Sequence, residues 1–253
     1  MPALIGAITL AGRRWGPAVA GWLSGFPIVT GPILLFVALE QGPQFAATTA
    51  TGALAGGIAW MTFALSYAWA ALYLPWYAAL FLSLCGWFAV GVVLVLAAPT
   101  FAWIVGLVAG AVLLVPHIFP RFSGALGVTR SASSEIFVRM AAGGLLTIAV
   151  TRFSSTLGPA FSGLFAVFPV MGIVLAAFSH RASGKLFTIH LLRGMVSGFY
   201  GFTVFCLTLA LYLAASGIAA GFLLALGLSL TVHFAVLWFT RRVRLGMPTQ
   251  QTR

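Results

Sequence analysis

Apolar runs of about 20 residues recur along the whole chain, separated by short polar or Gly/Pro-containing breaks. A run of this length crosses the hydrocarbon core of a bilayer as a helix, in which every backbone polar group is paired internally. The pattern predicts an all-α integral membrane protein with about eight or nine transmembrane helices. The expected segments cover roughly 2–12, 15–39, 45–73, 76–98, 100–117, 136–152, 157–179, 186–214 and 217–240.

The first of these segments is short. At 1.5 Å per residue it reaches only about 16 Å, too little to cross a core of roughly 30 Å. Either it is a partial helix or the true start of the protein lies upstream.

The composition agrees with the hydropathy pattern. Hydrophobic residues make up 62% of the 253 positions and charged residues only 6%, against about 25% charged in soluble domains. No stretch is long and polar enough for a separate soluble domain. The net charge of +11 does not indicate nucleic acid, because most Lys and Arg lie in short loops between apolar runs. The expected partner is the lipid bilayer.

The basic residues also set an orientation, because Lys and Arg concentrate in cytoplasmic loops. With the N-terminus outside, nearly all of them fall on the inner side, and the C-terminus lies in the cytoplasm. Arg152 is the one basic residue that falls on the outer side, and Glu40 lies on that side as well. The residues placed inside are Arg13, Arg14, Arg121, Arg130, Arg139, Arg181, Lys185, Arg241, Arg242, Arg244 and Arg253.

A Gly/Pro pattern occurs twice in apolar surroundings. Residues 16–31 read GPAVAGWLSGFPIVTG and residues 158–172 read GPAFSGLFAVFPVMG. A shift of 142 residues superposes residues 16–68 on 158–210 without gaps and gives 14 identities. Five segments separate equivalent helices, and this odd number predicts two repeats of inverted topology, a plan common in secondary transporters. We expect a first repeat over 1–99, a connecting span and loop over 100–135, and an inverted repeat with a basic tail over 136–253.

The first half also resembles a known family. The stretch AGWLSGFPIVTGPILLFVALEQG is similar to the signature of the GlpM-like family of small, four-span inner-membrane proteins. The second half keeps part of this pattern but has Ala182 where the first has Glu40. The resemblance implies a duplicated and fused four-span unit in the bacterial inner membrane, and it brings no settled activity. The matching residues are Ala20, Gly21, Phe26, Pro27, Glu40 and Gly42, with Gly163, Phe168, Pro169 and Gly184 in the second half.

The repeated Phe-Pro pairs are the first candidates for a site. Pro removes a backbone hydrogen bond and bends a helix, and broken helices expose backbone dipoles that can hold a solute near the midplane. We expect a substrate-binding region at Phe26, Pro27, Thr30, Phe168 and Pro169. The alternative is a packing kink, since Pro and Gly are frequent in membrane helices.

Polar positions on the following helix are the second candidates. Thr48 and Thr51 are equivalent to His190 and Arg193, and a spacing of three places each pair on one helix face. An Arg within a span either faces a cavity or extends to the interface, and the sequence leaves both open for Arg193. His233, mid-span in the last segment, either bonds a neighbouring helix or relays protons.

Little catalytic chemistry is available to this chain. Glu40 and Glu135 are its two carboxylates, so paired-carboxylate catalysis and a hard-metal cluster are excluded. Cys85 and Cys206 lie apart in apolar runs, without zinc-site spacing. We therefore expect no enzyme activity, no metal and no cofactor.

Two functions remain after these exclusions. The favoured one is a permease or channel-like transporter of a small solute, expected to be anionic or neutral. The alternative is a non-transporting accessory protein for an envelope or lipid-related partner, with a membrane enzyme the weakest reading. The sequence leaves the solute, the coupling ion and assembly as a homo-oligomer open.

Overall fold

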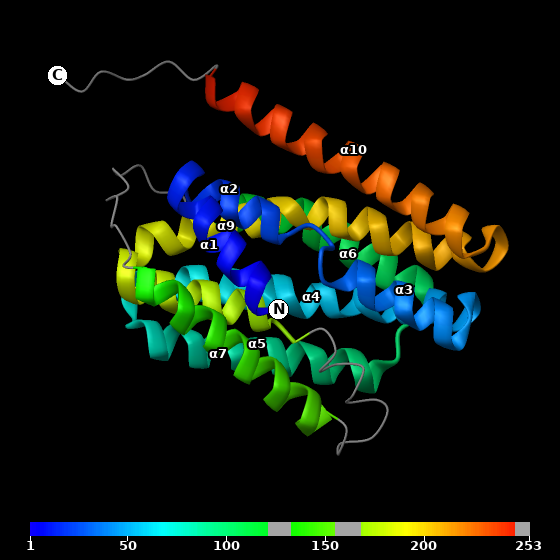
Figure 1. The fold of residues 1–253 in the computed structure, drawn as a ribbon, viewed down its shortest axis with the longest axis horizontal. Coiled ribbons are helices and arrows are strands. Elements are labelled where there is room, and N and C mark those ends of the chain that lie inside the picture. Colours follow the sequence, from blue (N-terminus) through cyan, green and yellow to red (C-terminus); the bar gives the residue numbers. More distant parts are fainter. Residues whose placement is uncertain (121–132, 155–167, 246–253) are drawn as a thin grey trace.

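The computed structural model describes residues 1–120, 133–154 and 168–245, and every regular element in these ranges is a helix (Figure 1). Five helices in this part of the chain are long and apolar enough to cross a membrane. The predicted all-α membrane class is confirmed at this level. The candidate spans are Pro43–Tyr73, Trp76–Ala97, Phe101–Ile118, Val170–Ser216 and Ile218–Trp238.

The observed helices follow the predicted segments with two differences. The segment expected over 15–39 is two short helices, because residues 25–29 are not helical. The segments expected over 157–179 and 186–214 meet in one long element, of which 157–167 lie outside the described residues. The elements are α1 (Pro2–Trp15), α2 (Pro17–Ser24), α3 (Thr30–Gln41), α4 (Pro43–Tyr73), α5 (Trp76–Ala97), α6 (Phe101–Ile118), α7 (Ser133–Ser154), α9 (Val170–Ser216) and α10 (Ile218–Leu245).

Two glycines interrupt the helices at equivalent positions. Gly42 separates α3 from α4 with φ 89° and ψ 164°, and Gly184 bends α9 with φ 82° and ψ 174°. This backbone region is open essentially to Gly. Each glycine therefore ends one helix and starts the next without a loop.

The two Phe-Pro pairs share one local geometry. The Ile28 amide donates to the Phe26 carbonyl at 2.7 Å, and the Val170 amide donates to the Phe168 carbonyl at 2.8 Å. Pro169 has φ −78° and ψ 49°, close to an inverse γ-turn. The expected kink is thus a tight turn, and in the first copy it interrupts the helix completely.

α4 and the part of α9 after Gly184 pack side by side at the centre of the molecule. They run antiparallel, since Lys185 Nζ donates to the Leu72 carbonyl at 3.0 Å, while Trp60 stacks on Phe199 near the middle of both helices. In Figure 1, α10 lies along one edge of this arrangement and α5 near the opposite edge.

α2 crosses α9 in direct backbone contact. A Cβ added to Gly194 would lie 2.4 Å from the Ala18 carbonyl oxygen, and one added to Gly198 would lie 2.6 Å from the Trp22 carbonyl oxygen. Gly21 and Gly25 approach α9 equally closely from the other side. Small residues at a spacing of four let two helices meet in this way.

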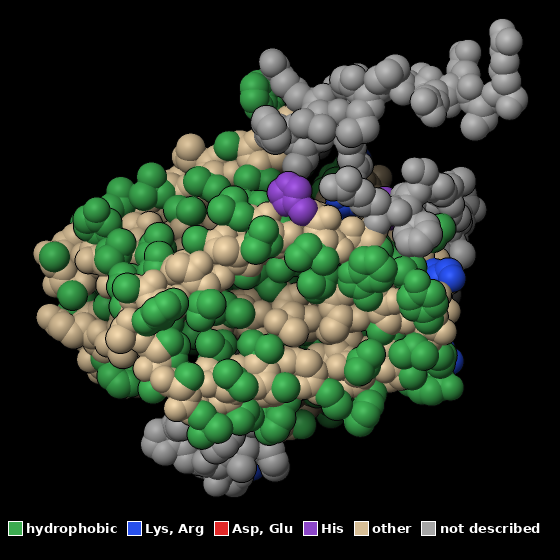
Figure 2. Space-filling model, turned by 180° about the vertical axis from the view of Figure 1, so that it is seen from behind, with side chains coloured by type: hydrophobic (Ala, Val, Ile, Leu, Met, Phe, Trp, Pro, Cys, Tyr) green, Lys and Arg blue, Asp and Glu red, His purple; other side chains and the backbone are tan. Residues whose placement is uncertain are grey.

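The outer surface is apolar. Large side chains on α5 and α6 are exposed, among them Phe81 at 71% and Trp103 at 69%. Figure 2 shows hydrophobic side chains spread over most of this face, with Lys and Arg visible at its right-hand edge and at a few other places on its margin. A broad apolar belt with basic residues at its end is typical of a protein surrounded by lipid.

Candidate functional site

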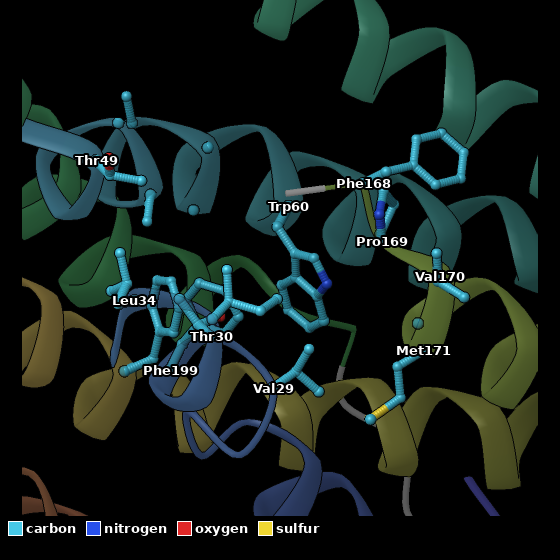
Figure 3. Close-up of a pocket in the computed structure, with 18 of the residues that line it drawn as sticks. Val29, Thr30, Leu34, Thr49, Trp60, Phe168, Pro169, Val170, Met171 and Phe199 are labelled. Carbon is cyan, nitrogen blue, oxygen red and sulfur yellow. The ribbon is translucent and has the colours of Figure 1, made fainter. Parts of the chain in front are cut away.

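A cavity of about 600 Å³ lies where the non-helical turn between α2 and α3 faces α4 and the beginning of α9. Its wall contains Phe26 and Thr30 from the first Phe-Pro region and Phe168 and Pro169 from the second. Figure 3 shows Val29 and Thr30 opposite Trp60 of α4, with Phe168 and Pro169 beyond it. Pockets of this size hold small organic molecules.

The structure brings five of the nine sequence-selected residues to this cavity. Besides the four residues just named, Thr48 of α4 lies on the wall. Pro27 is buried beside the cavity turn but is not on the wall. Thr51 also lies off the wall, and its hydroxyl donates to the Ala47 carbonyl at 3.2 Å.

His190 and Arg193 are half-buried on α9 and do not line the cavity. The neighbouring Gly194 packs against Ala18 of α2, so this stretch of α9 faces α2. The four polar positions expected to line one path are thus divided, with only Thr48 on the cavity.

Sequence reasoning missed an aromatic wall. Trp60 and Phe199 stack with ring centroids 4.4 Å apart and planes at 18°, and Phe199 and Phe202 follow at 4.7 Å. All three line the cavity. The sequence did contain a signal for this wall, because the 142-residue shift aligns one aromatic residue, Trp60, with another, Phe202, and aligns Gly57 with Phe199.

The polar atoms of the wall are mainly hydroxyls that already donate to their own helices. Ser24 Oγ donates to the Gly21 carbonyl at 2.7 Å, Thr48 Oγ1 to Gln44 at 3.2 Å and Thr49 Oγ1 to Phe45 at 2.9 Å. None of the described residues on the wall is Lys, Arg, His, Asp or Glu. The described side chains on the wall are therefore all uncharged.

His233 of α10 lies behind the cavity, 2% exposed. Its ring stacks on Trp22 at 4.0 Å and contacts Phe26, a cavity residue, at 5.1 Å. The Trp22 Nε1–H donates to the His233 carbonyl at 3.3 Å. Aromatic packing thus connects α10 to the first Phe-Pro turn.

The described part of the chain contains no cluster of three His, Cys, Asp or Glu that could hold a metal. Comparison with protein-family models, with curated proteins and with solved structures finds no match for this chain. The resemblance to the GlpM-like family therefore stays a prediction from the residues that carry it.

Proposed function

We propose that this protein is a permease for a small uncharged solute, built from two repeats of inverted topology. The observation that carries the proposal is the cavity, because its wall combines both Phe-Pro turns with α4 and α9. Transporters of inverted-repeat design bind their solutes at such broken helices near the membrane midplane. The proposal includes eight or nine spans, a bacterial inner membrane and a cytoplasmic C-terminus.

Contacts between equivalent residues support the repeat. A Cβ added to Gly57 would lie 3.1 Å from a ring carbon of Phe199, and these residues are equivalent because 199 − 57 = 142. Residues related by a two-fold axis touch each other only beside that axis. Phe199 also stacks on Trp60. The 142-residue shift pairs Phe199 with Gly57 and Trp60 with Phe202, so the equivalent contact is between Gly57 and Phe202. This contact is present, because a Cβ added to Gly57 would lie 3.5 Å from a ring carbon of Phe202.

A second pair of corresponding contacts between the two halves lies further from Gly57 and Phe199. Phe63 of α4 packs against Gly172 at the start of α9, and Phe205 of α9 packs against Gly31 at the start of α3. Phe63 and Phe205 are equivalent and both are fully buried. Each half thus inserts one Phe into the helix that follows the other half's Phe-Pro pair.

The helix ends support opposite orientations of the two halves. Lys185 follows Gly184 and bonds Leu72 near the C-terminal end of α4, whereas Gln44 follows Gly42 at its N-terminal end. The 31 residues of α4 span about 45 Å at 1.5 Å per residue. Equivalent helix junctions therefore lie a full membrane thickness apart.

The lack of charged side chains on the described wall changes the expected solute. An anion would need a positive group or several strong donors to offset its desolvation, and Arg193 and His190 lie off the wall. We therefore narrow the expectation of an anionic or neutral solute to a neutral one.

A cavity-filling substitution tests this function. Gly52 lines the cavity and an added Cβ meets nothing within 4 Å, so Gly52→Phe fills the space without a clash at its first atom. Gly106 of α6 is equally unobstructed but lies off the cavity, so Gly106→Phe is the matched control. We expect some neutral metabolites to raise the melting temperature of the purified wild-type protein and to enter proteoliposomes that contain it. Gly52→Phe should abolish both effects, whereas Gly106→Phe should retain them.

The alternative, a non-transporting accessory protein, makes the opposite prediction. If Gly52→Phe and Gly106→Phe both behave like wild type towards every compound in the screen, the permease proposal is refuted and the accessory-protein alternative is favoured.

A further inference from the structure

We infer that the cavity binds an elongated, uncharged amphipathic molecule, with a flat aromatic part at one end and a hydrogen-bond donor at the other. This inference rests on the proposed function only in taking the same cavity as the site. It comes from how the polar and aromatic atoms of the wall are distributed.

The aromatic end is a ready stacking surface. Trp60 and Phe199 are nearly parallel at 18°, and Phe168 lies on the same wall. Aromatic rings prefer stacked or edge-to-face partners and gain about 0.5–1.5 kcal/mol per pair beyond area burial. A flat ring system fits this end better than a branched aliphatic group of the same volume.

The polar end presents acceptors. A hydroxyl carries a single hydrogen, and Thr48 and Thr49 use theirs on the carbonyls of Gln44 and Phe45. Their oxygens therefore offer lone pairs to a ligand, and a ligand group that donates can bond them without breaking a helix contact. A ligand group that only accepts, such as an ether, cannot.

The two ends are separated along α4. Thr49 and Trp60 are eleven residues apart, which corresponds to about 16 Å at 1.5 Å per residue. Figure 3 shows Thr49 at one side of the cavity, with Trp60 and then Phe168 further across it. This separation calls for a molecule with a spacer between ring and donor.

A charged head group finds no charged side chain to pair with. The Trp60 indole and Thr30 are neutral groups on the wall, and none of the described side chains that line it is charged. A carboxylate buried in this cavity would lose its hydration without gaining an ion pair with one of these side chains, which costs several kcal/mol. Neutral donors such as alcohols and primary amides avoid this cost.

One series of probes on a common scaffold tests the inference. The probes are 6-(2-naphthyl)hexan-1-ol, its methyl ether and 6-(2-naphthyl)hexanoate, each measured by equilibrium dialysis against nanodiscs with and without the protein. We expect the alcohol to bind, the ether to bind about 2–12-fold more weakly for one lost neutral hydrogen bond, and the carboxylate at least 100-fold more weakly.

Two variants test whether the Thr48 and Thr49 hydroxyls are what distinguishes the alcohol from its methyl ether. Thr48→Val with Thr49→Val keeps the side-chain shape and removes both hydroxyls, so the alcohol should fall to the affinity of the ether while the ether is unchanged. Thr62→Val is the matched control, because Thr62 lies on the same helix, donates to the Ile58 carbonyl at 3.1 Å and is off the cavity wall. It should retain the wild-type ratio.

The inference is overturned if the carboxylate binds as well as the alcohol, or if the double variant keeps the alcohol-to-ether ratio of wild type. Failure of the permease proposal gives a different result. In that case the probes bind with the expected order, while proteoliposomes take up the alcohol no faster than protein-free vesicles.

Discussion

The crossing of α2 and α9 gives the sharpest test of the packing, because the 142-residue shift in the sequence provides a matched control position. Gly194 and Gly52 are equivalent positions, since 194 − 52 = 142. A Cβ on Gly194 would lie 2.4 Å from the Ala18 carbonyl oxygen, whereas a Cβ on Gly52 meets nothing within 4 Å. The same substitution, Gly→Ala, therefore meets backbone in one half and open cavity in the other.

The expected magnitude follows from this geometry. Ordinary contact begins at 3.4 Å, so Gly194→Ala must move α2 away by about 1 Å, and overpacking on this scale costs about 1–3 kcal/mol. Both glycines lie inside helices, so each Gly→Ala substitution gains about 0.5–1 kcal/mol of helix propensity, and this gain cancels between the two variants. We expect the free energies of unfolding of the two variants to differ by about 1–3 kcal/mol.

Unfolding by SDS in mixed micelles, followed by Trp fluorescence, measures this difference. Both variants carry the same added methyl group, so changes in the denatured state largely cancel. Equal stabilities, within about 0.5 kcal/mol, would refute the close α2–α9 contact and with it the asymmetry between the halves.

Two further predictions concern topology and the intramembrane cation. In a background with Cys85 and Cys206 replaced by Ser, a cysteine substituted for Gln44 should react with an impermeant maleimide from outside, and one substituted for Lys185 only from inside. Labelling of both positions from the same side would refute the inverted topology. Arg193→Leu should leave binding of 6-(2-naphthyl)hexan-1-ol within about twofold of wild type, because Arg193 is off the cavity wall; a loss of tenfold or more in dialysis would show that the site extends to α9 beyond the cavity.

The hydropathy pattern alone was enough to predict the helical membrane class and most helix boundaries. Apolar runs bounded by Gly and Pro predicted α4, α5, α6 and α10 to within a few residues of their observed starts, because a backbone in lipid has few alternatives to a helix. The boundary at Gly42 was also readable, since the glycine ends an apolar run. The bend at Gly184 lay at the expected boundary, but the near-continuous helix around it did not follow from the sequence.

The candidate site was only partly readable. The repeated Phe-Pro pairs directed attention to Phe26, Thr30, Phe168 and Pro169, all on the cavity, because a missing backbone donor is a local property of the chain. The search for polar spacing then selected Thr51, His190 and Arg193, which lie off the wall. Helical spacing says which residues share a face, but it does not say what that face meets.

Tertiary structure decided what the faces meet. Gly194 and Gly52 have the same place in the repeat and the same helical context, yet one contacts α2 and the other lines the cavity. Likewise, Trp60 and Phe199 form one wall of the cavity only because antiparallel packing of α4 and α9 brings together residues 139 positions apart. Backbone conformation and burial in lipid are set by short stretches of sequence, whereas a cavity is the space left between helices, and its shape depends on contacts between distant residues.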